Sequence, residues 1–81
     1  MRLSVLLIQN TLFDGEVKSV TLKTPGGEIT VLHNHEPIVS LVEYGDLKYV
    51  DESGESHTLH FPGGVLEVQP NGKVVVLAKQ I

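Results

Sequence analysis

Four histidines, in two groups, are the residues whose type and spacing come closest to supporting chemistry. His33 and His35 are separated by one residue, and His57 and His60 follow further along the chain. Neutral imidazole is the commonest metal ligand in proteins, and free histidine titrates near neutral pH. Residues three apart in a strand point to opposite faces, so His57 and His60 cannot both reach one ion. Any metal site would therefore depend on His33 and His35.

The histidines belong to a longer pattern that resembles the metal-binding jelly roll of the cupins: Gly27-x5-His33-x-His35, then Pro62-x-Gly64. Cupins place a glutamate shortly after the second histidine, but Val39 and Ser40 occupy those positions here. No histidine follows Gly64, where cupins carry another ligand. We therefore expect ordinary surface and loop histidines and no metal site. A small cupin-like metal-binding enzyme that uses His33 and His35 is the alternative.

Other catalytic arrangements are missing from the sequence. The serines do not form the G-x-S-x-G turn of hydrolases. The Gly26-Gly27 and Gly63-Gly64 pairs precede extended segments, whereas a phosphate-binding loop leads into a helix N-terminus. The chain has no cysteine, which excludes disulfides, thiolate metal sites and cysteine nucleophiles. We expect no catalytic residue and no cofactor.

The charge and hydropathy of the sequence argue against nucleic-acid binding and against a membrane-spanning segment. Six Lys and Arg against ten Asp and Glu give a net charge of −4, so there is no basic stripe for nucleic acid. No apolar stretch is long enough to span a bilayer, and the apolar run Val5–Ile8 is far shorter than the core of a signal peptide. We expect a chain that faces the cytosol.

The elements that position these residues are expected to be strands. The sequence holds a single alanine, Ala78, against 12 valines, and β-branched residues favour strands. Glycine and proline recur at short intervals, which leaves little room for helices. We predict one all-β domain over residues 1–81, a two-layer flattened β-sandwich or barrel of about eight to ten short strands. The expected strands are Arg2–Ile8, Phe13–Thr24 (bent or bulged at Gly15), Glu28–Leu32, Ile38–Val42, Gly45–Asp51, Glu55–Phe61, Val65–Gln69 and Lys73–Ala78.

Two segments depart from the alternation of apolar and polar residues. Val5–Ile8 and Val74–Leu77 are apolar at every position, although most strands of such a domain have one face in water. A tightly curled sheet that buries both faces would account for this pattern. A partner that covers the outer face would also account for it, because large exposed apolar patches mark interaction sites.

Four segments in this chain, in order, resemble the epsilon subunit of F-type ATP synthases. Gly64–Pro70 with Val74–Ala78 is similar to that family's G-G-[IVF]-[LA]-E-V-x-P…V-x-V-L-A run. The other three are Leu12–Val17, the loop from Gly27 through His35-x-Pro37, and Gly45–Leu47. Each segment alone is mostly turn glycines and strand apolar residues, but together they cover almost the whole chain.

The resemblance implies a non-catalytic β-sandwich that rides on the rotor of a proton-translocating ATP synthase. In that family this domain binds the gamma subunit and the c-ring, and helps couple rotation to ATP synthesis. Carried over by position, the residues expected to face the c-ring are Glu28, His33, His35 and Glu36. Those expected to face gamma are Leu7, Ile8, Val39, Ser40 and Leu41.

The family pattern also indicates what this chain is expected to lack. Family members usually continue into an alanine-rich helical hairpin that carries the ATP-responsive inhibitory function. The sequence stops at Ile81, so we expect the C-terminal helical domain to be absent and no ATP to bind. The expected location is peripheral, at the cytoplasmic face of the cell membrane, through the ATP synthase complex.

Overall fold

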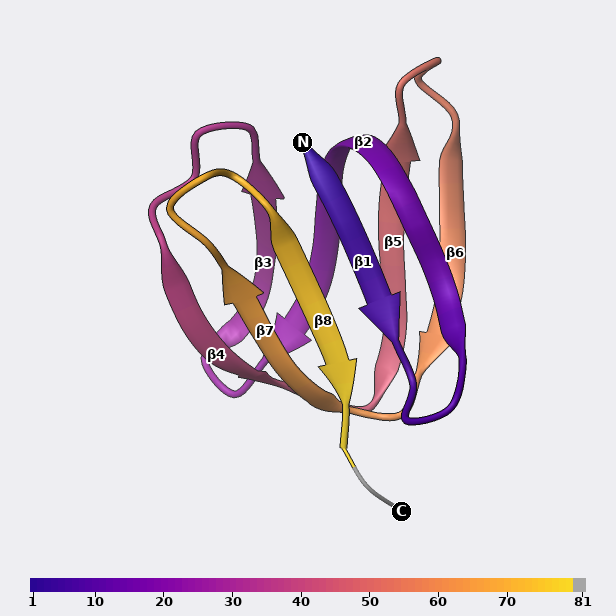
Figure 1. The fold of residues 1–81 in the computed structure, drawn as a ribbon. Helices are drawn as coiled ribbons and strands as arrows, with labels where there is room; N and C mark the ends of the chain where they lie inside the picture. The colour runs from indigo at the N-terminus through magenta and orange to yellow at the C-terminus, as the bar shows by residue number, and fades with distance from the viewer. Residues whose placement is uncertain (80–81) are drawn as a thin grey trace.

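Eight strands make up the part of the chain that the computed structural model describes, residues 1–79 (Figure 1). The strands are β1 (Arg2–Leu6), β2 (Thr11–Thr24), β3 (Gly27–Leu32), β4 (Ile38–Val42), β5 (Gly45–Asp51), β6 (Ser56–Phe61), β7 (Gly64–Val68) and β8 (Val74–Ala78). No helix occurs between residues 1 and 79, and hence none that could cross a membrane. The all-β prediction is confirmed. The last two residues of the expected 1–81 domain lie outside the described residues.

The long strand β2 joins two layers. Its first half pairs with β1, and β1, β8, β7 and β4 continue this layer, which we call sheet A. Its second half pairs with β3 on one side and β5 on the other, and β6 completes this layer, sheet B. Figure 1 shows sheet A in front of sheet B. The strands are antiparallel except for β1 and β8, which run parallel.

The core lies between the two sheets and follows from the alternation of side chains along each strand. Leu66 and Val68 of β7 are buried while Glu67 is exposed. In β5, Leu47 and Tyr49 are buried while Lys48 is exposed. The largest fully buried side chains are Phe61, Leu3, Leu22, Leu47 and Leu66. Removing apolar surface from water gains about 25 cal/mol per Å², so burial of these side chains is the main contribution that holds the two sheets together.

Two hairpins close with the same three-residue loop. In the β7–β8 hairpin, Gly72 N–H donates to the Gln69 carbonyl (2.9 Å), and the β5–β6 hairpin repeats this bond from Gly54 to Asp51 (3.0 Å). Both glycines have positive φ, 86° and 93°, as this loop requires of its last residue. The Pro70-Asn71-Gly72 and Glu52-Ser53-Gly54 turns expected from the sequence are therefore confirmed.

One local expectation is wrong. β2 has no bulge at Gly15, because this residue pairs in regular register with Leu3. The shifts in register lie elsewhere, between Val5 and Leu6 against β2 and between Val17 and Ser19 against β5. A Cβ on Gly15 would lie 3.1 Å from the ring of Phe13. The glycine therefore makes room for an aromatic ring at the edge of the core.

Candidate interaction surface

An apolar row crosses the outer face of sheet A from edge to centre. Leu41 of β4 pairs with Val65 of β7, Val65 pairs with Leu77 of β8, and Leu77 pairs with Leu6 of β1. Adjacent strands lie about 4.8 Å apart, so these four residues, the apolar row, extend over about 14 Å. The exposed fractions are 63% for Leu41, 40% for Val65 and 48% for Leu77. This outer face offers a partner a continuous apolar strip.

The same face is polar at its other end. Arg2 donates two hydrogen bonds to the carboxylate of Asp14, 3.1 and 3.0 Å long, and the Ser4 hydroxyl donates a third at 2.9 Å. The Arg2 hydrogen bond, with the Ser4 bond next in effect, lowers the pKa of Asp14 and keeps it ionised. A solvated ion pair therefore bounds the apolar strip on one side, the usual arrangement of a polar rim around an apolar centre.

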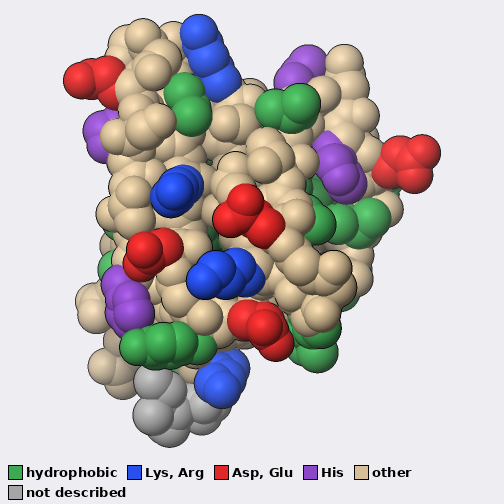
Figure 2. All heavy atoms as spheres, turned by 180° about the vertical axis from the view of Figure 1, so that it is seen from behind, with side chains coloured by type: hydrophobic (Ala, Val, Ile, Leu, Met, Phe, Trp, Pro, Cys, Tyr) green, Lys and Arg blue, Asp and Glu red, His purple; other side chains and the backbone are tan. Residues whose placement is uncertain are grey.

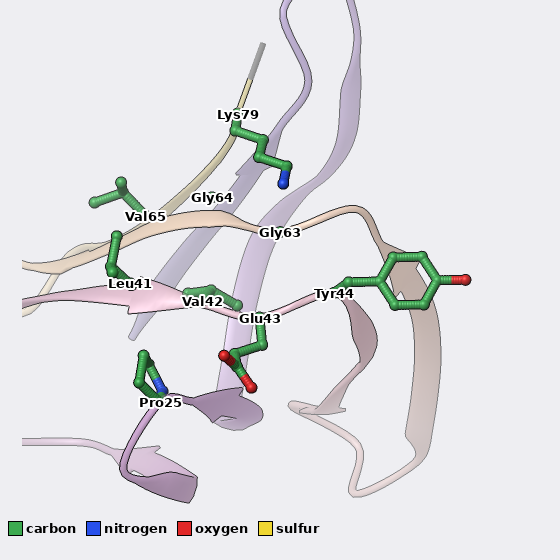
Figure 3. A pocket seen from close by; sticks show the side chains of 9 residues that line it. All are labelled: Pro25, Leu41, Val42, Glu43, Tyr44, Gly63, Gly64, Val65 and Lys79. Carbon is green, nitrogen blue, oxygen red and sulfur yellow. The ribbon is translucent and has the colours of Figure 1, made fainter. Parts of the chain in front are cut away.

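A shallow hollow lies beside the apolar row, and Figure 3 shows its side chains. Leu41 and Val65 contribute one wall and belong to the row itself. Tyr44, which is 70% exposed, extends from the β4–β5 connection, and its ring contacts His60 edge-on at 5.0 Å between centroids. In Figure 3 the Tyr44 ring points away from Leu41 and Val65, so this tyrosine lies at the margin of the hollow and outside the apolar row. The hollow and the row together form one candidate docking surface.

The structure brings together most of the residues expected to face gamma. Val39 and Leu41 both lie on the outer face of sheet A. Leu7 and Ile8 continue from the other end of the apolar row, with Leu7 packed partly against the core and Ile8 54% exposed. Ser40 is separate from them, since it pairs opposite the fully buried Leu66. Contact between these residues and gamma stays a prediction.

Three of the four residues of the row, Leu6, Val65 and Leu77, were missed by the sequence-based assignment, which placed only Leu41 near gamma. Val65 and Leu77 link Leu41 to Leu6, so they connect the two groups that the sequence left apart. One signal was present, because Val74–Leu77 is apolar on both faces. The pairing of β7 with β4, which places Val65 beside Leu41, is a long-range contact that local alternation does not reveal.

The residues expected to face the c-ring do not form one cluster. Glu28 lies near the start of β3, where it pairs with Lys23 of β2. His33, His35 and Glu36 follow the end of β3, and a strand rises about 3.3 Å per residue, so about 17 Å separates Glu28 from His33. His35 is held in the turn, where Nδ1 donates to the Glu36 carbonyl at 2.7 Å. The role of each residue stays a prediction.

The histidines are not gathered into one site. His57 stacks on Tyr49 at 4.9 Å, and its Nε2–H donates to Asp51 at 2.7 Å, while His60 lies beside Tyr44 on the outer face. Among residues 1–79, the one His/Asp/Glu group close enough to share an ion is Asp51, Glu55 and His57, which includes neither His33 nor His35. Asp51 already accepts bonds from its own loop, and its hydrogen bond from His57 is the main cause of its lowered pKa.

The outer face of sheet B contrasts with that of sheet A. Figure 2, which views the molecule from behind, shows cationic and anionic side chains interspersed over this face. Cross-strand neighbours there are polar, such as Thr21 and Thr30, whose hydroxyls are 2.9 Å apart. Leu32, at the end of β3, is an isolated exposed leucine on this face, and single exposed leucines are normal on protein surfaces. The outer face of sheet B therefore has the mixed charges of an ordinary solvated surface.

Comparison with known proteins gives one consistent family. The family model for the ATP synthase delta/epsilon chain, beta-sandwich domain, matches residues 1–81. The ATP synthase epsilon chain of Acinetobacter baumannii (strain SDF) is 37% identical over 78 residues, 96% of this chain and 55% of that protein. The epsilon chain of Bordetella petrii is 38% identical over 78 residues with the same coverage. The chain thus spans about half the length of these curated relatives.

Solved structures agree with the sequence matches. A chain in the cryo-EM structure of the Euglena gracilis mitochondrial ATP synthase, OSCP/F1/c-ring, superposes with a TM-score of 0.88 at 26% identity, over 96% of this chain and 49% of that one. A chain of the Tetrahymena thermophila mitochondrial ATP synthase central stalk and c-ring superposes with a TM-score of 0.79 at 16% identity, over 99% of this chain and 63% of that one, and shows the fold alone.

These matches decide between the two resemblances. The cupin alternative is not supported, since the matching family model describes a different β-sandwich over the full length. The epsilon resemblance is confirmed by the family model, by the curated relatives and by the Euglena structure. The chain belongs to the family of ATP synthase delta/epsilon chain β-sandwich domains.

Proposed function

We propose that this domain is a non-catalytic part of the central stalk of a proton-translocating F-type ATP synthase. It docks on the gamma subunit and the c-ring and helps couple rotation to ATP synthesis. It needs no cofactor, does not bind nucleic acid, and resides at the cytoplasmic face of the membrane through the complex. Its membership of the family and its similarity to chains of ATP synthase structures support this role.

The apolar row is the observation that carries the proposal. Leu41, Val65 and Leu77 are large side chains that project from the outer face of sheet A with no covering element among residues 1–79. Covering them removes apolar surface from water and stabilises the complex. We assign this surface to the gamma subunit, because it unites Val39 and Leu41 with Leu7 and Ile8, the residues that the family pattern places near gamma.

The c-ring contact is assigned to polar residues of the β3 region. Glu28 is an exposed carboxylate at one end of β3, and His33 and Glu36 are exposed side chains at the other end. Charges of this kind orient a docking partner and speed its association more than they increase affinity. Because the two groups lie at opposite ends of β3, a single loop of the c-ring is expected to contact one group and not both.

Co-purification with a gamma subunit and c-ring tests the proposal. A charge at the centre of the apolar row, in Leu77→Asp, would have to be buried in the complex, so we expect binding of gamma to be lost. Thr58→Asp places the same charge on the exposed outer face of sheet B, beside Lys48, and is expected to bind normally. Equal retention of gamma by both variants would move the docking surface elsewhere, and failure of the unaltered chain to bind would remove the proposed role.

A further inference from the structure

The tip of the β7–β8 hairpin carries a residue pair prone to a spontaneous covalent change. Asn71 is exposed and is followed by Gly72, the one Asn-Gly pair in the chain. Gly72 has no Cβ to shield its backbone nitrogen from the side chain before it. We propose that Asn71 is a site of deamidation in the folded protein, through a succinimide formed with Gly72.

The reaction needs no reagent other than water and base. Gly72 N loses its proton to solvent and forms a bond to Cγ of Asn71, the Cγ–Nδ2 bond breaks, and ammonia leaves. Water then opens the five-membered ring at either carbonyl, giving aspartate or isoaspartate at position 71. The net change is amide plus water to carboxylic acid plus ammonia, and it adds one negative charge at neutral pH.

The turn presents the side-chain amide to this reaction. Lys73 N–H donates a hydrogen bond of 3.0 Å to Oδ1 of Asn71. A donor at this oxygen polarises the carbonyl and stabilises the negative charge that develops there when Cγ is attacked. Asn71 also lines a shallow hollow with Arg2, Lys73 and Glu16, so charges of both signs surround the position where the product carboxylate forms. The bond from Gly72 N–H to the Gln69 carbonyl slows the loss of the amide proton, so the reaction requires this bond to open first.

The other asparagines are internal controls. Asn10 precedes Thr11, a β-branched residue at the start of β2, and Asn34 precedes His35. Both following residues carry a side chain next to the attacking nitrogen, and the β-branched one is the most crowded. The Asp14-Gly15 pair lies within the regular β1–β2 ladder, and its carboxylate is held by Arg2. We expect none of these to react before Asn71.

The product alters the hairpin. Isoaspartate adds a carbon to the main chain of a three-residue loop that is closed by the bonds Gly72 N to Gln69 O and Gln69 N to Lys73 O. An additional backbone atom displaces at least one of these bonds, next to the buried pair Val68 and Val74. The isoaspartate form is therefore expected to melt at a lower temperature than the aspartate variant Asn71→Asp, which keeps the normal backbone.

Incubation of the folded protein at mildly alkaline pH, followed by charge separation and peptide mapping, tests this proposal. The expected result is a single shift to a more acidic species, with aspartate and isoaspartate at position 71 while Asn10 and Asn34 remain amides. Asn71→Ser, which keeps an acceptor in the turn, is expected to give no acidic species. Conversion at Asn10 or Asn34 first, or conversion of Asn71 only after unfolding in urea, would overturn the proposal.

Discussion

Truncating one exposed leucine on each outer face distinguishes which face of the sandwich binds gamma. Leu41→Ala shortens a side chain of the apolar row, and Leu32→Ala makes the same change on the outer face of sheet B. The two leucines are 63% and 57% exposed, so they are closely matched in the isolated domain. Both substitutions are expected to change its free energy of unfolding by less than about 0.5 kcal/mol. Only their effect on binding differs.

The size of the binding effect follows from the surface that remains to be covered. Full burial of a leucine side chain is worth about 1.5–3 kcal/mol. With 63% of Leu41 still exposed, a partner that covers it completely gains about 1–2 kcal/mol from this side chain. A change of about 1.4 kcal/mol is tenfold in Kd, so Leu41→Ala is expected to weaken binding about 5- to 30-fold.

Calorimetric titration of the purified chain with its gamma subunit measures this difference. Urea unfolding of each variant first establishes that the fold is intact. Leu41→Ala is expected to raise Kd, while Leu32→Ala leaves it unchanged. If the two variants bound equally well, or if Leu32→Ala were the weaker binder, gamma would not occupy the outer face of sheet A.

Two further predictions concern the stability of the domain. A Cβ at Gly64 would collide with the backbone carbonyl oxygen of Leu77, so Gly64→Ala is expected to lower the free energy of unfolding by about 1–3 kcal/mol and to lower Tm in thermal melting. Gly26→Ala is the control and is expected to change Tm little, because no backbone atom lies near its Cβ. Several hydrogen bonds lower the pKa of Asp51, and the one from His57 has the largest effect. The stability that this carboxylate contributes is therefore fully present above its unfolded pKa of about 4, and it is lost as the pH falls toward the lower folded pKa. Asp51→Asn is expected to reduce the urea midpoint at pH 7 and to make that midpoint fall less steeply below pH 4. If the midpoint of the variant fell with acid as steeply as that of the unaltered chain, Asp51 would not be the source of the acid sensitivity.

The strands were predictable because their signals are local. Glycine-containing turns bound most strands, and Ile38–Val42 and Gly45–Asp51 have the bounds that the sequence predicts. The alternation in Val65–Gln69 correctly separated buried from exposed positions. The single alanine, Ala78, is buried and pairs opposite Gly64, where a Cβ on Gly64 would collide with the backbone of β8.

The docking surface was only partly predictable because it depends on which strands are neighbours. β4 lies beside β7 and β8 beside β1, and both pairings join segments far apart in the chain. Periodicity gives the face of each side chain but not the order of strands, so Val65 could not be joined to Leu41. The separation of Glu28 from His33 has a different origin, because the predicted strand Glu28–Leu32 already implied it, while the family pattern assigned both ends of that strand to one contact.

Thiol labelling shows directly whether gamma covers the apolar row, because the sequence contains no cysteine and a single engineered thiol reports one position. Leu77→Cys places the thiol in the apolar row, and Thr58→Cys places it on the outer face of sheet B. Both are expected to react freely in the isolated domain. In the complex with gamma, Leu77→Cys is expected to become protected while Thr58→Cys still reacts. Labelling of Leu77→Cys at an unchanged rate in that complex would contradict it.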